Sequence, residues 1–447
     1  MDTGSSLIFP ETGPDLIALL EERLTPGAAQ CIRAVRECSQ RTGVSACLVG
    51  GSVRDLLLGK SIVDLDVVVE GDGIAFAQEL AGLENRDMVP FSRFGTAFVI
   101  LPPGIKVDIA TARRESYPEP GLLPEVEPAT LDEDLLRRDF TINAMAIRLG
   151  PAGYGTFIDQ HGGCRDLRAG IIRVLHDDSF RDDPTRILRA VRFRTRLQYA
   201  FDDTTEELLV QAVQTGMLDE VSRQRIREEI VAILTEDEAA HSLASLSITG
   251  IWNALFKYDI ILPEATGDLF QRGHEALKWY RDLAQDHGLA EVETWVVRWL
   301  LLAGKSPAAT FIRVSRHFHM GRAVNRAARD RLDRYPFALA ILLDDSRRTD
   351  SALYRSLSAL GPESIVLLAG EGGRRARAGL EHFITRLMVM EPFVDGHDLK
   401  AMKVAKGPLV GEILGQVFTA QLDGAVQTRA EALELAKRLA ATSGKGR

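Results

Sequence analysis

The sequence has few cysteines, and none of them stands in a metal-binding or disulfide-rich pattern. The four are Cys31, Cys38, Cys47 and Cys164, and no pair has the CxxC spacing of a zinc ribbon. Neither a structural zinc site nor a disulfide framework is therefore indicated. A chain of 447 residues has ample room for a buried core. At about 150 residues per domain, this length predicts two to four folded units.

An excess of positive charge is also missing. The chain has 54 Lys and Arg against 63 Asp and Glu, which gives a formal net charge of −9. This balance excludes a protein coated with basic residues for nucleic-acid binding. Any contact with RNA or DNA must therefore use a local basic patch.

Long hydrophobic runs are absent as well. The most apolar stretch, residues 295–304, is interrupted by Arg298 and is too short to span a bilayer. The first ten residues, MDTGSSLIFP, lack the basic start and apolar core of a secretory signal. No repeat with a period of 20–50 residues suggests a solenoid. We therefore expect a globular protein of the cytoplasm.

Two kinds of pattern divide the chain. After a lead-in over residues 1–25, short β-branched runs alternate with short helical segments as far as residue 173, which predicts a mixed α/β head. The expected strands are 46–49, 62–69, 94–101 and 105–111, and the expected helices are 28–41, 53–58 and 74–80. From residue 182 onward apolar residues recur three and four apart, which predicts helices at 186–197, 205–213, 225–234 and most of 265–390. The expected fold class is α+β, with a small α/β head and a long helical remainder.

Residues 113–134 contain four prolines and Gly121. This composition predicts a long, mobile loop between the head strands. Loops of such length inside a domain tend to be functional.

The strongest local signal is LVGGSVRDLLLGKSIVDLDVVVEGD, residues 48–72. Gly50 and Gly51 follow an expected strand and open a helix, so their N–H groups could hold a phosphate. Asp64 and Asp66 are two apart on the next strand, which directs both carboxylates to one face. Two neighbouring carboxylates repel unless a cation lies between them, and oxygen ligands suit Mg²⁺. The pattern therefore predicts a magnesium site beside a phosphate-binding turn.

A third acid, Asp108, lies in the expected strand IKVDIATAR. It could complete the metal site as a catalytic carboxylate, or it could accept a hydrogen bond from a neighbouring backbone. The sequence leaves both roles open.

The second signal is RRDFTINA, which starts at Arg137 and Arg138. Two guanidiniums can bind a triphosphate through paired hydrogen bonds. Asp139 or Asn143 could accept hydrogen bonds from ribose hydroxyls. A solvated helix start is the alternative for this motif when it is taken alone.

The third signal is DDPTRILRAVR, in which Asp183, Arg186, Arg189 and Arg192 recur every three residues. Asp183 is expected to cap a helix that starts at Pro184, and the four charged residues form one ridge. A carboxylate accepts from an exocyclic amine, and a guanidinium donates to the ring acceptor beside that amine. Cytosine and adenine present this edge, so the ridge could select C or A without a template. A salt-bridged surface helix is the alternative.

Together these motifs resemble the class II tRNA nucleotidyltransferases, which include bacterial CCA-adding enzymes. GGSVRD with DLD, RRDFTINAMA, IDQHGGCRDLRAGIIRVL and DDPTRILRAVRF follow the family's order between residues 48 and 193. QRIREE, residues 224–229, resembles the next helical motif, with Gln224 where the family usually has Glu. Residues 393–433 resemble the family's C-terminal tRNA-binding region.

The resemblance implies a polymerase-β-like head over 26–173, a base-recognising neck over 174–236, and a tRNA-binding body and tail over 237–447. It implies that Gly50, Gly51 and Arg54 hold the triphosphate and that Asp64 and Asp66 bind Mg²⁺. It also implies that the phosphates and sugar are contacted by Arg137, Arg138 and Asp139. The residues that it implies for recognition of the base are Asp183, Arg186, Arg189 and Arg192. The implied reaction is attack of a tRNA 3′-hydroxyl on the α-phosphorus of ATP or CTP, with no membrane or DNA partner.

The segment RRESYPEPGLLPEVEPATLDED departs from CCA-adding relatives, because acids and prolines stand where basic residues are usual. It is closer to relatives that add only the terminal A, so A addition is expected and C addition stays open. A bacterial poly(A) polymerase is one alternative, although FSRFGTA at residues 91–97 differs from that group's GRRF stretch. A catalytically inactive nucleotide- or RNA-binding relative is the other.

Single residues elsewhere are ambiguous. The lone histidines His161, His176 and His397 have no metal-ligand spacing and are interpreted as structural. The basic residues of the body and tail either contact tRNA phosphates or belong to a solvated surface, and the sequence leaves both roles open. They are Arg374, Arg375, Arg377, Lys400, Lys403 and Lys406.

Overall fold

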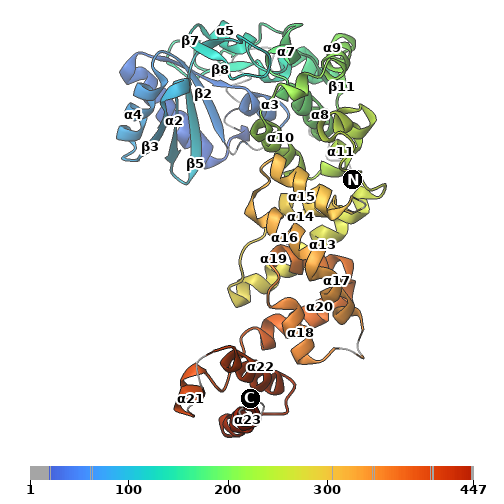
Figure 1. The fold of residues 1–447 in the computed structure, drawn as a ribbon. Helices are drawn as coiled ribbons and strands as arrows, with labels where there is room; N and C mark the ends of the chain where they lie inside the picture. The colour runs from blue at the N-terminus through green and yellow to red at the C-terminus, as the bar shows by residue number, and fades with distance from the viewer. Residues whose placement is uncertain are drawn as a thin grey trace. The chain divides into compact units, whose positions relative to one another are not determined.

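The computed structural model describes residue 20 and residues 22–60, 62, 64–304, 306–344, 346, 348–402, 404 and 407–443. The chain divides into two compact units, Met1–Ile233 with His241–Leu255 and Leu234–Ala240 with Phe256–Arg447. Figure 1 labels the elements of both. The predicted lead-in lies mostly outside the described residues, and the finer division into head, neck, body and tail stays a prediction.

A seven-stranded sheet forms the centre of the first unit. Its strands, in spatial order, are β3 (Met88–Phe91), β4 (Thr96–Leu101), β5 (Ile105–Thr111), β2 (Leu65–Glu70), β1 (Ser45–Val49), β8 (Ala146–Arg148) and β9 (Phe157–Ile158). Only the β2–β5 pair of this sheet is parallel. Two small sheets accompany it, an antiparallel pair of β6 (Arg113–Ser116) with β7 (Glu125–Pro128) and a parallel pair of β10 (Ile171–Ile172) with β11 (Ala200–Phe201).

The helices of this part of the chain are short. They are α2 (Pro26–Thr42), α3 (Gly51–Leu57), α4 (Gly73–Leu83), α5 (Leu131–Leu136), α6 (Gly163–Ala169), α7 (Ser179–Asp182), α8 (Thr185–Leu197), α9 (Asp203–Gln214), α10 (Arg223–Thr235), α11 (Ala239–Ile248) and α12 (Ile251–Phe256). Single 3₁₀ turns are η1 (Ser92–Phe94), η2 (Thr141–Asn143) and η3 (Met217–Asp219).

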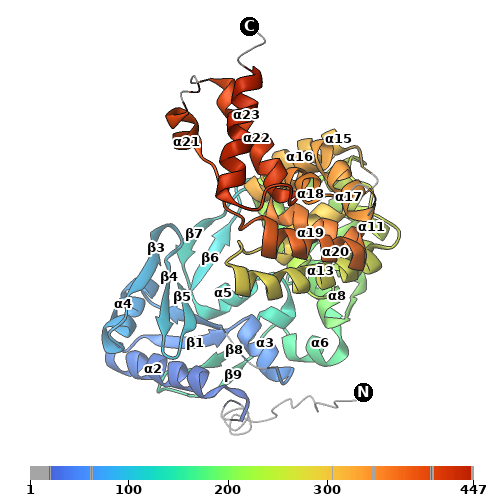
Figure 2. The same ribbon diagram turned by 90° about the horizontal axis from the view of Figure 1, so that it is seen from below.

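Both faces of the central sheet are covered. Helices α2 and α4 pack on one face (Figure 2). On the other face Val49 and Val68 share a buried cluster with Leu131 and Leu135 of α5. Strands buried on both faces read as nearly continuous apolar runs, which is why β1 and β2 could be recognised from the sequence.

The regular elements in the described part of the second unit are all helices or helical turns. Its elements are α13 (Thr266–His287), α14 (Thr294–Leu301), α15 (Ala308–His317), α16 (Gly321–Asp333), α17 (Tyr335–Leu343), α18 (Asp350–Leu357), α19 (Pro362–Glu371), α20 (Gly373–His382), the π-helical turn η4 (Phe383–Leu387), α21 (Gly396–Ala401), α22 (Pro408–Leu422) and α23 (Arg429–Ser443). Trp299 is fully buried against Phe311 and Phe256, and its Nε1 donates to Ser315 Oγ at 3.0 Å. Such burial of aromatic side chains is a large part of the stabilisation of a helical core.

The α+β fold class is confirmed, but two local predictions were wrong. Residues 113–134 are not one long loop, because they contain the β6–β7 hairpin and the start of α5. The hairpin is polar, and Arg114 lies opposite Glu127 with an ion pair of 2.6 Å between them. A strand also occurs beyond residue 182, since β11 pairs with β10.

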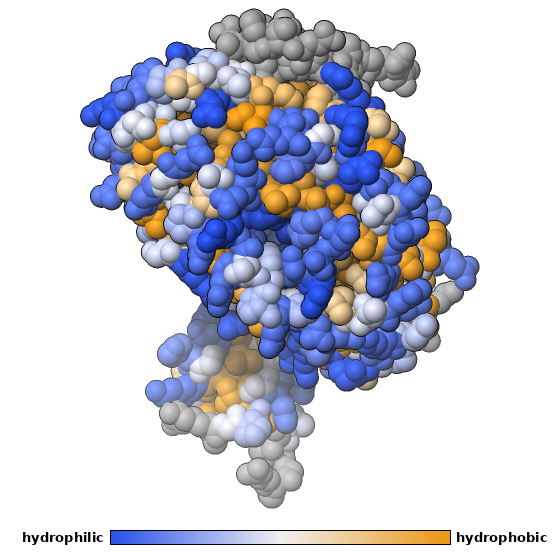
Figure 3. All heavy atoms as spheres, turned by 90° about the horizontal axis from the view of Figure 1, so that it is seen from above, coloured by the Kyte–Doolittle hydropathy of each residue, from blue (hydrophilic) through white to orange (hydrophobic). Residues whose placement is uncertain are grey.

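The surface is mainly hydrophilic on the face drawn in Figure 3, where apolar residues form smaller patches. Among the described residues, no helix has the length and apolar character that crossing a bilayer requires.

Candidate functional site

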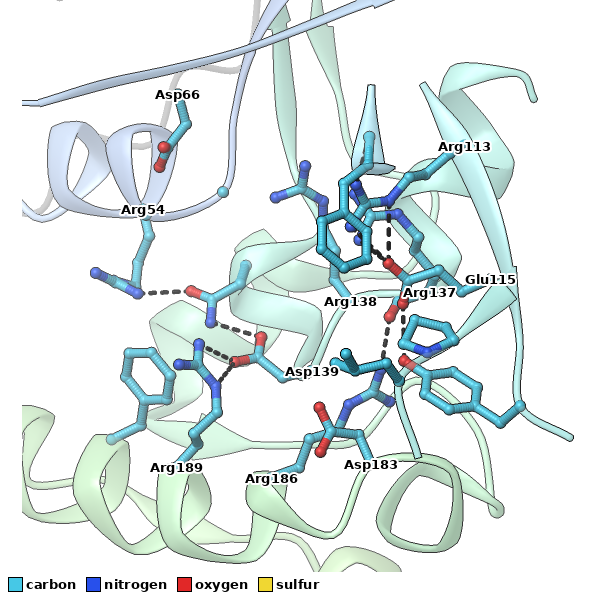
Figure 4. Close-up of a pocket in the computed structure, with 18 of the residues that line it drawn as sticks. Arg54, Asp66, Arg113, Glu115, Arg137, Arg138, Asp139, Asp183, Arg186 and Arg189 are labelled. Atoms are coloured by element: carbon cyan, nitrogen blue, oxygen red, sulfur yellow. Dashed lines mark hydrogen bonds and ion pairs between the residues drawn. The ribbon is translucent and has the colours of Figure 1, made fainter. Parts of the chain in front are cut away.

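A cavity of about 560 Å³ opens in the first unit (Figure 4). The residues expected from the sequence that line it are Gly50, Gly51, Arg54, Asp66, Arg137, Arg138, Asp139, Asn143, Asp183, Arg186 and Arg189. Asp64, Asp108 and Arg192 are not among its lining residues. Three segments that are far apart in the sequence therefore meet around one cavity.

The glycine turn between β1 and α3 brings the backbone close to an arginine. Gly50 has a φ of +68°, and a Cβ added there would lie 2.7 Å from Nη1 of Arg138. Only glycine accepts both conditions without strain. Ser52 of α3 then connects this turn to the next strand, because its Oγ donates to the Asp64 carbonyl and accepts from the Asp66 N–H.

Asp64 and Asp66, whose backbone groups Ser52 contacts, are the acids that were expected to bind a metal. Asp64 precedes β2 rather than lying within the strand as expected. Asp66 is the register partner of Asp108 on β5, whose carboxylate pairs with Lys106 Nζ at 2.7 Å.

The pKa of Asp66 is raised from its ordinary value. Loss of surrounding water raises the pKa most, Arg138 opposes that change, and the negative charges of Asp108 and Asp64 raise the pKa further. Asp66 is nevertheless exposed to the open cavity. A carboxylate beside two other carboxylates is suited to a cation. Among the described residues, however, no three His, Cys, Asp or Glu side chains are grouped closely enough to hold a metal by themselves.

A buried acid holds the two consecutive arginines. Helix α5 begins with a capping box between Thr130 and Glu133, which places Asp134 in its first turn. Asp134 is fully buried and accepts from Arg137 at 2.7 Å and from Arg138 at 2.9 Å. Burial alone raises the pKa of Asp134, but these two guanidiniums outweigh burial and lower it.

The two arginines differ in what remains available to a ligand. Arg137 also donates to Glu115 at 2.9 Å, so all three of its guanidinium nitrogens are bonded. Arg138 has a buried Nε without a hydrogen-bond partner among the described residues, and its Nη1 lies over Gly50. Arg138 is therefore the cation of this pair that is suited to bind an anion in the cavity.

Asp139 is the centre of a second network. Its Oδ2 accepts from Arg189 at 2.7 and 3.0 Å, and its Oδ1 accepts from Asn143 Nδ2 at 2.8 Å. Burial by itself raises the pKa of Asp139, but Arg189 and the hydrogen bonds lower it to about 2. Arg54 joins the network through Asn143 Oδ1 at 2.6 Å and also pairs with Asp55.

The segment before and within α8 supplies the third side of the cavity. Asp183 Oδ1 accepts from the Thr185 N–H at 3.0 Å, so it caps the helix as expected, although α8 begins at Thr185 rather than at Pro184. Arg186 is buried, which does not fit the alternative of a solvated surface helix at this position, and it donates to Ser179 Oγ and to the Arg137 carbonyl. Arg192 contacts Glu229 at 3.6 Å.

Sequence reasoning missed several residues of the cavity wall. They are Phe94, Arg113, Glu115, Tyr117, Leu123, Pro124, Phe193 and Arg196. The alternation of Arg113 and Glu115 along a strand was a usable signal, because residues two apart share a face. Phe193 gave a weaker signal, because it is an aromatic residue among the arginines of one helix. In the structure the guanidinium carbons of Arg54 and Arg189 lie 5.1 and 5.5 Å from its ring centroid.

Two sequence families match the chain. The Poly A polymerase head domain matches residues 46–173, and the probable RNA and SrmB-binding site of polymerase A matches residues 198–264. An A-adding tRNA nucleotidyltransferase of Geobacter sulfurreducens is 35% identical over 98% of this chain, which spans 50% of that longer relative. An A-adding tRNA nucleotidyltransferase of Halalkalibacterium halodurans is 32% identical and is covered over 95% of both chains.

A solved structure agrees with these relatives. The apo form II of a CCA-adding enzyme superposes with a TM-score of 0.75 at 32% identity, covering 94% of this chain and 97% of the other. Identity of 32% over 95% of the Halalkalibacterium halodurans relative, together with the shared fold, supports a single conclusion. This chain belongs to the family of tRNA nucleotidyltransferases.

Proposed function

We propose that this chain adds A to the 3′ end of tRNA without a nucleic-acid template, and that C addition is open. The observation that carries the proposal is the single cavity lined by Asp66, Arg138 and the Asp183–Arg186 pair. These residues offer, in turn, a negative site for a cation, a cation for phosphates, and a donor–acceptor pair for a base. The A-adding activity of both relatives supports the choice of A.

The proposed reaction is an in-line displacement. The terminal 3′-hydroxyl oxygen of tRNA forms a bond to the α-phosphorus of ATP, the α–β anhydride bond breaks, and pyrophosphate leaves. The hydroxyl proton passes to solvent or to a carboxylate. Such a reaction needs little covalent chemistry from the protein, so positioning and charge supply most of the rate.

Asp64 and Asp66 would hold Mg²⁺, and Asp108 would join them only if its carboxylate left Lys106. Bound there, the ion would neutralise charge on the phosphates and acidify the 3′-hydroxyl. Arg138, whose Nη1 lies at the Gly50–Gly51 turn, would bind the triphosphate there. Arg137 would act mainly by holding Arg186 through its carbonyl.

The proposed base contacts use the atoms that the protein leaves available. Asp183 would accept from the exocyclic amine of adenine or cytosine, and Arg186 would donate from Nε to the adjacent ring nitrogen. Asp139 would keep Arg189 beside the sugar. Uracil and guanine present the reverse pattern at this edge, so they would leave buried groups unpaired.

The proposed partner is tRNA, whose processing would place the protein in the cytoplasm. A second cavity, of about 500 Å³, is lined by Arg316 of α15 and, on α16, by three arginines with one amide and one acid, which are Arg322, Arg326, Arg329, Asn325 and Asp330. Arg322 and Arg329 are exposed, and Arg326 pairs with Glu363. Exposed guanidiniums grouped in an acidic protein are suited to backbone phosphates. Of the basic residues expected from the sequence, Arg374, Arg375 and Lys400 are exposed, whereas Lys403 and Lys406 lie outside the described residues.

Transfer to defined tRNA ends tests the proposal. Transcripts that end before CCA, after C and after CC are each incubated with ATP or CTP, and incorporation of label is measured. We expect ATP to be added once to the CC end, and CTP addition to the shorter ends decides whether C is also a substrate. Repeated ATP addition to unstructured RNA would instead identify a poly(A) polymerase. Absence of any transfer by the wild type, at several divalent-ion concentrations, would identify an inactive relative.

A further inference from the structure

The two carboxylate oxygens of Asp183 have different surroundings. Oδ1 accepts three hydrogen bonds, from the N–H and Oγ1 of Thr185 and from Nη2 of Arg225 at 2.7 Å. Oδ2 accepts none within the described part of the chain. Because the carboxylate lines the cavity, Oδ2 is the oxygen that is left for a ligand. The orientation of the carboxylate therefore decides which acceptor a base would meet.

Arg225 comes from a different element, α10, and its guanidinium makes two contacts. Besides the bond to Asp183, Nη1 donates to the carbonyl of Gly121 at 3.1 Å. The side chains of Arg225 and Asp183 are only 20% and 18% exposed, so the pair is shielded from water. A charge-assisted bond in such a setting is stronger than one on the surface.

Gly121 is itself fixed against the segment before α10. It has a φ of +73°, and a Cβ added there would lie 2.6 Å from the carbonyl oxygen of Glu220. The same loop contributes Leu123 and Pro124 to the cavity wall. The Gly121 carbonyl is thus held in place, and it fixes the end of the guanidinium opposite to Asp183.

We propose that Arg225 is a positioning residue for base selection, which orients Asp183 by holding Oδ1 while the Gly121 carbonyl holds Arg225. This inference rests on the proposed function, because it concerns the residue that would read the base. Rotation of a carboxylate about its last bond costs little, so the Thr185 bonds alone leave the plane of the group less defined. A second donor on Oδ1 limits that rotation and keeps Oδ2 towards the cavity.

The test compares selectivity, which a merely structural residue would not alter. Arg225→Gln, Arg225→Lys and Gly121→Ala are each assayed for kcat/KM with ATP and with GTP on tRNA ending in CC. We expect the ATP-to-GTP ratio to fall roughly tenfold in Arg225→Gln, the loss of one charged hydrogen bond. The Lys variant keeps the charge but cannot bond both partners as a fork, so its ratio should be intermediate. Gly121→Ala should lower the ratio through the other end of the same chain of contacts.

The matched control is Arg223→Gln, two residues away on α10, outside the cavity lining and 3.9 Å from Asp219. Its ATP-to-GTP ratio should equal that of the wild type. Thermal unfolding of every variant separates loss of fold from loss of selectivity, and the Lys and Gly121 variants serve if Arg225→Gln does not fold. An unchanged ratio in the Arg225 variants and in Gly121→Ala, with rates that fall equally for both nucleotides, would overturn the proposal.

A binding measurement keeps this inference separate from the proposed function. Displacement of a fluorescent ATP analogue by ATP and by GTP gives the preference of each variant without any transfer. If the wild type transfers no nucleotide, the proposed function fails, yet a preference for ATP that is lost in Arg225→Gln still supports the role of Arg225. If the wild type transfers nucleotide but the Arg225 variants keep its preference for ATP over GTP, the proposed function holds and the role proposed for Arg225 is wrong.

Discussion

Asp66 on β2 and Asp139 after α5 line the same cavity, yet their pKa values are shifted in opposite directions. Asp66 lies beside Asp64 and Asp108 and has a raised pKa, whereas Asp139 accepts from Arg189 and Asn143 and has a pKa of about 2. The protein therefore gathers negative charge on the β2 side, where Lys106 and Arg138 compensate it only in part, and neutralises it on the α5–α8 side. A site for a cation needs the first arrangement, and a rigid wall for recognition needs the second.

The largest expected effect is the loss of activity when one of the acids on the β2 side is replaced. Asp66→Ala and Asp64→Ala should each lower nucleotide transfer by roughly 10³-fold, because several kcal/mol of charge stabilisation disappear. Incorporation of labelled AMP into tRNA ending in CC measures the effect. Asp87→Ala, an exposed acid of the same unit, is the control and should keep its rate. Near-normal transfer by both variants would contradict the role given to this pair.

Stability should respond in the opposite sense on the two sides. Asp139→Asn removes the shorter of the two ion pairs of Arg189, which keeps Glu229 at 3.5 Å, and should lower the free energy of unfolding by about 2 kcal/mol. Asp66→Asn removes one negative charge from beside those of Asp108 and Asp64, so it should raise the free energy of unfolding while abolishing transfer. Urea denaturation at pH 7 measures both. Equal destabilisation by the two substitutions would remove the contrast between the two sides.

The pH dependence follows from the same two shifts. The folded-state pKa of Asp139, about 2, lies below its ordinary 3.8, so the stabilisation is complete above pH 3.8 and is lost as the pH falls towards 2. This difference corresponds to about 2 kcal/mol. The pKa of Asp66 is raised, so the ionised group costs stability and the advantage of Asp66→Asn should grow as the pH rises above 3.8. Denaturation of both variants and the wild type between pH 2 and 7 checks the two opposite slopes.

The sequence was informative where one short segment contains the whole pattern. The apolar runs of β1 and β2, the helix expected over 28–41 and the cap from Asp183 all depend on neighbours within a few residues. The polar hairpin of β6 and β7 was missed because its strands have no buried apolar face to mark them. Its stability comes from pairs such as Arg114 with Glu127, and pairing of this kind is set by tertiary structure.

The partners of the site residues were the least predictable part. Arg137 bonds Glu115, 22 residues away, and Asp183 bonds Arg225, 42 residues away. The spacing of charges along α8 indicated which residues share a side of the helix, but it carried no information on what they contact. The contacts that bury Arg186, with Ser179 and with the Arg137 carbonyl, could not be read from that spacing. Long-range ion pairs need the fold before they can be assigned.

The smallest expected effect concerns tRNA rather than the two sides of the cavity in the first unit. Replacing Arg322 and Arg329 of α16 with Gln should raise the KM for tRNA a few-fold and reduce the slope of log affinity against log salt by about 1 per lost phosphate contact. The KM for ATP should stay unchanged, because neither residue lines the cavity of the first unit in which ATP is proposed to bind. Arg313→Gln is a suitable control, since Arg313 is engaged with Asp259 at 2.9 Å. If the double variant leaves the KM for tRNA unaltered, the proposal that α15 and α16 bind tRNA phosphates is wrong. The basic residues that line the cavity of the first unit would then be the next candidates for tRNA binding.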